Sequence, residues 1–335
     1  MVNVFAEARR VLRDDGVLFL NLGDSYITHP HGPKGANAQD PKWAHARVRG
    51  RVGKGMGQAN RTSIAGLKHK DLVGIPWRVA FALQAAGWYL RSDIIWNKPN
   101  CMSESVFDRP TKSHEYIFLL TKKPRYYYDG LAIREKSVSG HSSGSKGRKA
   151  NHQNGRSGFS INPPWHSDTR NKRSVWSINT KPLKAAHFAT FPPALVLPCI
   201  LAGTSEKGCC PICGAQWKRI VKRERKPTRP GVDSKVYAEP PLHADSPHRR
   251  HNGDICGNRD PQRHITTFTT TGWKQGCDCE PQPPIPCTVA DMFAGSGTVG
   301  VVAKQQGRSF IGCELNPAYR DMAEKRIQAV GESLF

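Results

Sequence analysis

The chain has 335 residues, of which 50 are Lys or Arg and 27 are Asp or Glu, so its formal net charge is +23. No apolar run approaches the roughly 18 residues that a membrane-spanning helix needs, and we find no apolar signal-peptide core, so a cytoplasmic protein is expected. The basic excess favours a polyanionic partner, first of all a nucleic acid.

The first elements predict an α/β fold. Apolar residues recur at helical spacing over residues 4–12, and a buried strand is expected over residues 17–20. This strand stops at the polar sequence Asn21-Leu22-Gly23-Asp24. Polar residues at the carboxyl end of a strand face the crevice in which such folds bind ligands, so Asp24 is a pocket candidate. An Asx-turn cap is its structural alternative.

A basic segment follows. Residues 41–70 contain eight Lys or Arg, no acid and no apolar period. We expect a basic loop over residues 29–70 that contacts phosphates without sequence selectivity. The alternative is a solvated insertion with no ligand.

The middle of the chain continues the core and then changes character. A helix is expected over residues 72–86, with Ile75, Val79, Ala82 and Leu83 inward, and strands over residues 89–96 and 115–121. Residues 122–180 are rich in Ser, Gly and cations and begin with three tyrosines, which suits base stacking and phosphate contact. They form the predicted target-recognition region; a tyrosine-bearing strand and a flexible loop are the alternative.

An extended segment over residues 174–180 precedes a helix that starts near residue 192 and ends at residue 202. A Pro-rich insertion then brings two short-spaced cysteine pairs, Cys210 with Cys213 and Cys277 with Cys279. Such pairs can close a tetrahedral zinc site, and a structural zinc would hold together a segment with little apolar core. Cys209 and Cys256 are substitute ligands, and free thiols are the alternative.

The most informative stretch is residues 289–316. A short strand ends at Asp291, a turn contains Gly295 and Gly297, a helix runs to about residue 306, and a second strand is closed by Glu314. Glycines at these two positions permit a sharp turn and leave no Cβ in the way of a ligand. An acid after the second strand is placed to bind a ribose hydroxyl, so a nucleoside-bearing cofactor is expected. The spacing does not fit the GxGxxG pattern of NAD-binding proteins.

This stretch resembles motif I of the S-adenosylmethionine-dependent DNA methyltransferases that modify exocyclic amino groups. The matching positions are Asp291, Phe293, Gly295, Ser296, Gly297, Thr298, Glu314, Asn316 and Pro317. The segment KPLKAAHFATFPPALV resembles motif X, which implies a cofactor role for His187 and Phe188. The resemblance implies double-stranded DNA as partner, N4 of cytosine favoured over N6 of adenine as target, and a prokaryotic or phage restriction-modification enzyme acting in the cytoplasm near the nucleoid. It names no partner nuclease.

The catalytic tetrad of that family, a Ser, Asp or Asn followed by Pro-Pro and an aromatic residue, is absent from its expected place ahead of residue 4. We expect that an upstream segment or a second polypeptide supplies it. A tetrad of the right type, Asn162-Pro163-Pro164-Trp165, lies in a Ser/Gly-rich loop and is a weak catalytic candidate.

Three other interpretations stay open. The chain could be a cofactor- and DNA-binding remnant without activity. It could be a C5-cytosine enzyme with Cys199 or Cys287 as nucleophile, although both cysteines look structural. RNA could replace DNA as substrate.

The expected architecture is a Rossmann-like α/β methyltransferase sheet with helices on both faces, in permuted motif order, with inserted basic recognition loops and a small zinc-binding insertion. The expected segments are residues 1–121 (half of the core), 122–180 (target recognition), 181–202 (motif X turn and helix), 203–285 (cysteine-bearing insertion) and 286–335 (cofactor-binding βαβ unit).

Overall fold

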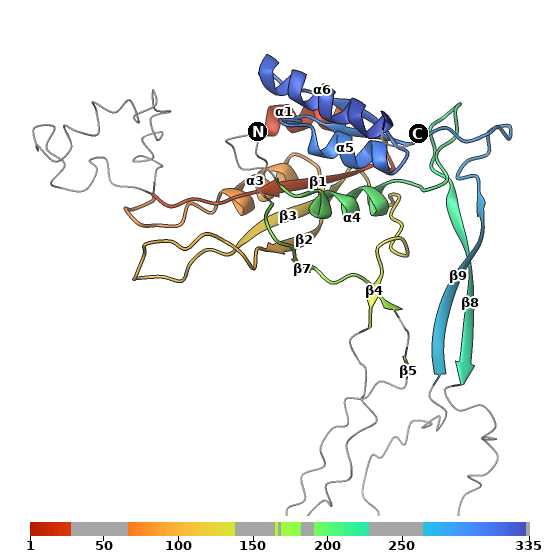
Figure 1. Cartoon of the computed structure of the whole chain (residues 1–335), viewed down its shortest axis with the longest axis horizontal. Coiled ribbons are helices and arrows are strands. Elements are labelled where there is room, and N and C mark those ends of the chain that lie inside the picture. The colour runs from red at the N-terminus through yellow and green to blue at the C-terminus, as the bar shows by residue number, and fades with distance from the viewer. Residues whose placement is uncertain (28–65, 138–164, 167–168, 182–190, 228–263, 333–335) are drawn as a thin grey trace, which may run out of the picture. The chain divides into compact units, whose positions relative to one another are not determined.

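The computed structural model describes residues 1–27, 66–137, 165–166, 169–181, 191–227 and 264–332. Residues 29–65 of the expected basic loop over residues 29–70 therefore lie outside the described residues. The chain divides into two compact units (Figure 1). The first consists of Met1–Tyr128, Arg173–Gly203 and Val289–Phe335, and the second of Asp129–Lys172 and Thr204–Thr288.

The first unit is built on a mixed four-stranded sheet with the order β1-β3-β2-β7. The middle strand β3 is antiparallel to β1 and β2, and β7 is parallel to β2. The strands β1, β2 and β7 therefore run in one direction, and their carboxyl ends share one edge of the sheet. The bounds are β1 Val17–Leu22, β2 Tyr89–Asn97, β3 His114–Thr121 and β7 Val175–Ser177.

Helices cover both faces of this sheet, as the continuous buried run at the end of β3 requires. Phe118 and Leu120 pack with α1 (Val2–Val11) and α3 (Ile75–Ala85). Ile117 points to the other face, where it joins a cluster that includes Leu195 of α4 (Pro193–Gly203). The predicted α/β fold, with helices on both faces of the sheet, is confirmed.

The helix α3 begins later than expected, at Ile75, because Gly74 takes a left-handed conformation with φ of 72° and Pro76 occupies the first turn. Leu83 is buried as predicted. The prediction for Ala82 is wrong, since Ala82 is exposed and Ala80 is buried instead. The helical spacing of the apolar residues was predicted correctly. The buried face of α3 differs from the predicted one, because Pro76 and Ala80 pack inward together with Leu83.

The C-terminal βαβ unit is present as predicted. It consists of β10 (Thr288–Asp291), α5 (Thr298–Gln305) and β11 (Ser309–Gly312), and α6 (Pro317–Glu332) follows. Val302 and Ala303 of α5 pack against α4. Among the described strands, β10 pairs only with β11, and β1 pairs only with β3.

The second unit is dominated by a long antiparallel ribbon of β8 (Lys218–Pro227) and β9 (His264–Lys274), drawn in green and blue in Figure 1. The short strand β5 (Trp165–His166) pairs with the far end of β9, and β4 (Glu135–Lys136) pairs with β6 (Thr169–Arg170). Residues 129–172 and 204–288 thus form one unit, although the sequence suggested separate segments.

No helix in the described ranges is both long enough and apolar enough to cross a membrane.

Candidate cofactor site and cysteine cluster

The turn between β10 and α5 contains two glycines with different physical roles. Both have positive φ, 51° at Gly295 and 76° at Gly297. A Cβ on Gly297 would lie 2.7 Å from the Cβ of Ala323 and 2.9 Å from its Cα, so Gly297 lets α6 approach the turn. A Cβ on Gly295 would meet only the carbonyl oxygen of Phe293, at 3.8 Å. Gly295 therefore leaves an open backbone surface.

Gly297→Ala is expected to destabilise the fold by about 2–4 kcal/mol, because the new methyl group would overlap α6 backbone at a position of left-handed φ. Urea unfolding of the full chain, compared with the wild type, measures this loss. A loss below about 0.5 kcal/mol would contradict the close packing of α6 on the turn.

The carboxylate of Glu314 joins the end of β11 to this turn. Its Oε2 accepts a hydrogen bond from the Gly295 N–H at 2.8 Å, and its Oε1 accepts one from the Asn316 N–H at 2.8 Å. Each carboxylate oxygen has a second lone pair, so Glu314 can also accept hydrogen bonds from a ligand. The carboxylate is thus fixed by backbone donors beside the open surface at Gly295.

Other motif I residues shape the same turn. Asp291 Oδ1 accepts a hydrogen bond from the Phe293 N–H at 3.0 Å. Burial raises the pKa of Asp291 above its usual value, and the nearby charge of Glu314 adds to this shift. Asn316 Oδ1 accepts a hydrogen bond from the Ala318 N–H and so caps α6. Ser296 and Thr298 are buried, and Arg326 of α6 donates to the Ser296 carbonyl oxygen.

Asp291→Asn is expected to stabilise the free protein at neutral pH. A raised pKa means that the folded state holds the Asp291 proton more tightly than the unfolded state, so wild-type stability falls as pH rises from below 3.8 through the folded pKa. The amide avoids this penalty, and its oxygen can keep the bond to Phe293. The advantage of the variant in free energy of unfolding should grow between about pH 3 and pH 7. An advantage that shrinks over this range would contradict the assignment.

The remaining predicted site residues have mixed outcomes. His187, Phe188, Asn162, Pro163 and Pro164 lie outside the described residues, and Trp165 is the first residue of β5. Asp24 Oδ1 accepts hydrogen bonds from the N–H groups of Ser25 at 2.8 Å and Ile75 at 3.0 Å. The second bond ties Asp24 to the first residue of α3, which is a structural role. The role of Asp24 in a ligand pocket stays a prediction.

Polar residues that the sequence reasoning missed gather at the carboxyl ends of β2 and β7. Lys98 forms an ion pair with Glu115 and lies 4.4 Å from the ring centroid of Trp96. Asn97 donates to Ser177 Oγ at 3.0 Å. The sequence held a signal for them, because polar residues at the carboxyl end of an apolar strand face the ligand crevice of α/β folds. Asn97 is the last residue of β2, and Lys98 follows it.

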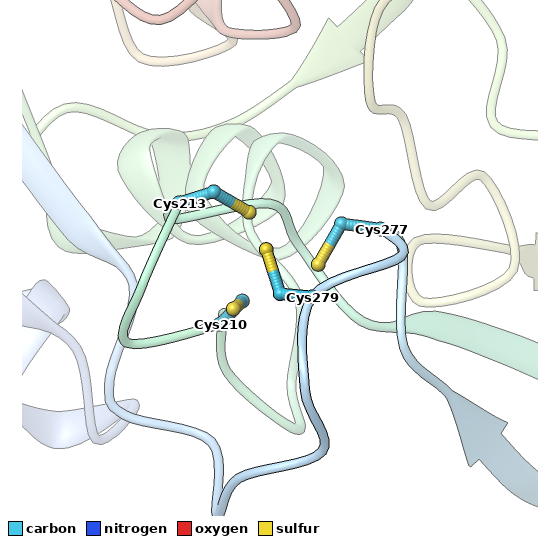
Figure 2. Close-up of side chains that lie close together, drawn as sticks. All are labelled: Cys210, Cys213, Cys277 and Cys279. Carbon is cyan, nitrogen blue, oxygen red and sulfur yellow. The ribbon is translucent and has the colours of Figure 1, made fainter.

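The second unit brings together the four predicted metal ligands. The sulfur atoms of Cys210, Cys213, Cys277 and Cys279 all lie within 4.8 Å of one another and point toward a common centre (Figure 2). Cys210 and Cys213 precede β8, whereas Cys277 and Cys279 follow β9, so the cluster closes one end of the ribbon. Four thiols in this arrangement are compatible with a tetrahedral zinc site.

The thiols of this cluster influence one another. The backbone N–H of Cys279 and then the Gln275 amide lower the pKa of Cys277 to about 6. Hydrogen bonding to Cys213 and to Cys277 raises the pKa of Cys279 to about 12. A bound dication would favour the thiolate at every position.

The other cysteines weighed above look structural. Cys209 is buried and its Sγ contacts the Pro286 carbonyl oxygen at 3.8 Å, while Cys256 lies outside the described residues. Cys287 is buried near the Gln216 side chain, and Cys199 lies within α4. Neither Cys199 nor Cys287 is placed as an exposed nucleophile.

A glycine turn after a strand, an open backbone surface and an acid fixed at the end of the next strand are features of α/β domains that bind nucleotide cofactors. The family model described as DNA methylase matches residues 1–210 and 287–325. The chain belongs to this family of DNA methylases, and the resemblance seen in motif I is confirmed.

Relatives with known names match nearly the whole chain. The Type II methyltransferase M.Cfr9I of Citrobacter freundii is 38% identical over 328 residues, which cover 98% of this chain and 70% of that protein. The Type II methyltransferase M.SmaI of Serratia marcescens is 35% identical over 98% of this chain and 72% of its own length. The solved PvuII DNA methyltransferase (cytosine-N4-specific) gives a TM-score of 0.46 at 12% identity and covers 99% of this chain and 74% of that one.

Proposed function

We propose that this protein transfers a methyl group from S-adenosylmethionine to an exocyclic amino group of a base in duplex DNA, at a short specific site and in the cytoplasm. N4 of cytosine is the favoured target, with N6 of adenine second. The carrying observation is the turn at Gly295, whose open backbone surface lies beside the fixed carboxylate of Glu314. Membership of the DNA methylase family supports this proposal.

The residues of the turn have distinct tasks in this proposal. Gly295 leaves room for the cofactor against the backbone, and Glu314 accepts hydrogen bonds from the ribose hydroxyls. The cofactor supplies a methyl group that its sulfonium already activates, so the protein chiefly aligns the amino group of the base with it. The basic excess of the chain, +23, holds the DNA.

The proposal is tested by incubating the full chain with S-adenosylmethionine labelled on the methyl group and with duplex DNA. The digested nucleosides are then separated by mass. Labelled N4-methylcytosine is expected; labelled N6-methyladenine would change the target, and label at C5 of cytosine would refute the reaction class. Transfer to tRNA at a higher rate than to duplex DNA would make RNA the substrate.

A second candidate is a chain that binds cofactor and DNA but needs an additional segment or a second polypeptide for catalysis. It is favoured by the described sheet, in which β1 and β10 each have a partner on one side only. The same assay on a chain extended upstream in its gene distinguishes the two. Full activity of the 335-residue chain alone would exclude this candidate.

We also propose a structural zinc ion held by Cys210, Cys213, Cys277 and Cys279. The convergence of their sulfur atoms from two segments far apart in the chain supports this site.

A further inference from the structure

The β8–β9 ribbon lies outside the part of the chain that the family shares. The DNA methylase model matches residues 1–210 and 287–325, so it omits residues 211–286. The similarity to M.Cfr9I and M.SmaI covers 98% of this chain. The ribbon is therefore an addition to the core of the family, and the alignments with these two relatives extend over it. An added element of this kind suits a role in choosing the DNA site.

One face of the ribbon is held by its own unit. Arg219 of β8 donates two hydrogen bonds to the buried carboxylate of Asp129, at 3.0 and 2.9 Å. The same guanidinium lies 4.4 Å from the ring centroid of Trp273, which is its direct partner on β9, and donates to Thr270 Oγ1 at 2.8 Å. This network holds the Arg219 face of the ribbon against its own unit and leaves the opposite face free of these contacts.

The opposite face carries exposed cations. Because side chains alternate along a strand, Lys218 and Ile220 point away from the face of Arg219, and both are exposed. Lys218 lies directly opposite Lys274 of β9. Within the described part of the chain, no carboxylate pairs with Lys218 or Lys274.

Like charges directly opposite each other across two strands are destabilising. By this rule the charges of Lys218 and Lys274 oppose the pairing of β8 with β9, whereas Lys222 has a partner in Glu224, at 2.8 Å. A polyanion laid along this face would turn the repulsion into attraction. Exposed lysines also deter strands from aggregating, but that role predicts no dependence of DNA affinity on them.

We propose that this exposed face of the β8–β9 ribbon lies in the major groove of duplex DNA, with Lys218 and Lys274 on phosphates. The major groove of B-DNA is about 12 Å wide and admits a two-stranded β-ribbon, whereas the major groove of A-form RNA is too narrow. The inference rests on the proposed function, since it makes the ribbon the element that places a DNA methylase on its site.

The test compares a double variant, Lys218→Gln with Lys274→Gln, with a matched control, Lys304→Gln with Lys325→Gln. The control lysines are exposed on α5 and α6 of the first unit. Binding of the full chain to a fluorescent duplex is measured against salt concentration, alongside thermal unfolding and S-adenosylmethionine binding.

The slope of log K against log salt should become less negative by about 1.8 in the ribbon variant, because two phosphate contacts at about 0.9 each are lost. Its melting temperature should stay level or rise, since a repulsion is removed. The major-groove ligand methyl green should compete with binding, and the minor-groove ligand distamycin should not.

An unchanged slope in the ribbon variant, or an equal change in the control, would overturn the ribbon proposal and leave the proposed function standing. Competition by distamycin alone would also overturn it. If the wild-type chain binds cofactor but no duplex at any salt, the proposed function fails together with the ribbon proposal.

Discussion

Replacing Gly295 by alanine is expected to weaken S-adenosylmethionine binding strongly while the chain stays folded. A Cβ at this position would meet no protein atom closer than 3.8 Å, so the only protein cost is the left-handed φ of 51°. That cost is about 1–2 kcal/mol. The methyl group would occupy the open surface beside Glu314, and we expect the affinity for the cofactor to fall by about 100-fold or more, roughly 2.7 kcal/mol.

Gly307 provides a matched control for this variant. It has a φ of 68°, and a Cβ there would meet nothing within 4 Å. Gly307→Ala should therefore cost the fold about as much as Gly295→Ala, while calorimetry should show cofactor binding close to that of the wild type. Equal cofactor affinity in the two variants would refute the assignment of this turn. Because both variants carry the same backbone cost, loss of binding through unfolding would appear in both.

The sequence predicted the elements whose hydrophobic pattern is strong. The apolar runs of β1, β2 and β3 and the glycine turn after Asp291 were located to within about two residues, the usual uncertainty of element boundaries. Local pattern is enough there because burial on one or both faces dictates the residue types.

The β8–β9 ribbon was not predicted because its strands lack such a pattern. Lys, Arg and Thr make up most of the two strands. The face that packs on its own unit depends on the hydrogen bond from Arg219 to Asp129, which is 90 positions away in the chain. A contact between residues so far apart in the chain produces no hydrophobic periodicity in either segment. Long-range pairing, rather than local propensity, therefore decides this part of the fold.

The chemistry of the site was only partly readable from the sequence. Motif I named Gly295, Gly297 and Glu314 together, but their separate tasks depend on how closely α6 approaches each glycine. The ion pair of Lys98 with Glu115 joins the ends of two adjacent strands, and the register that brings them together is fixed only in the folded sheet.

Replacing Cys213 by serine is expected to release the proposed zinc ion and to loosen the ribbon. The four thiols join the segment before β8 to the segment after β9, and a metal held there would keep these two segments together at one end of the ribbon. Structural zinc contributes about 10–16 kcal/mol in zinc-finger peptides, so losing one ligand should have a large effect. We expect about one zinc per purified wild-type chain and nearly none in the variant.

Cys101→Ser is the matched control, because Cys101 is a free thiol outside the cluster. Hydrogen exchange should show lost protection along β8 and β9 in Cys213→Ser but not in the control. Affinity for S-adenosylmethionine should not change in either variant, since the proposed cofactor residues belong to the other unit. Retention of zinc by Cys213→Ser would show that Cys213 is not a required ligand. Unchanged protection of the ribbon after the metal is removed by a chelator would show that the metal does not stabilise the ribbon.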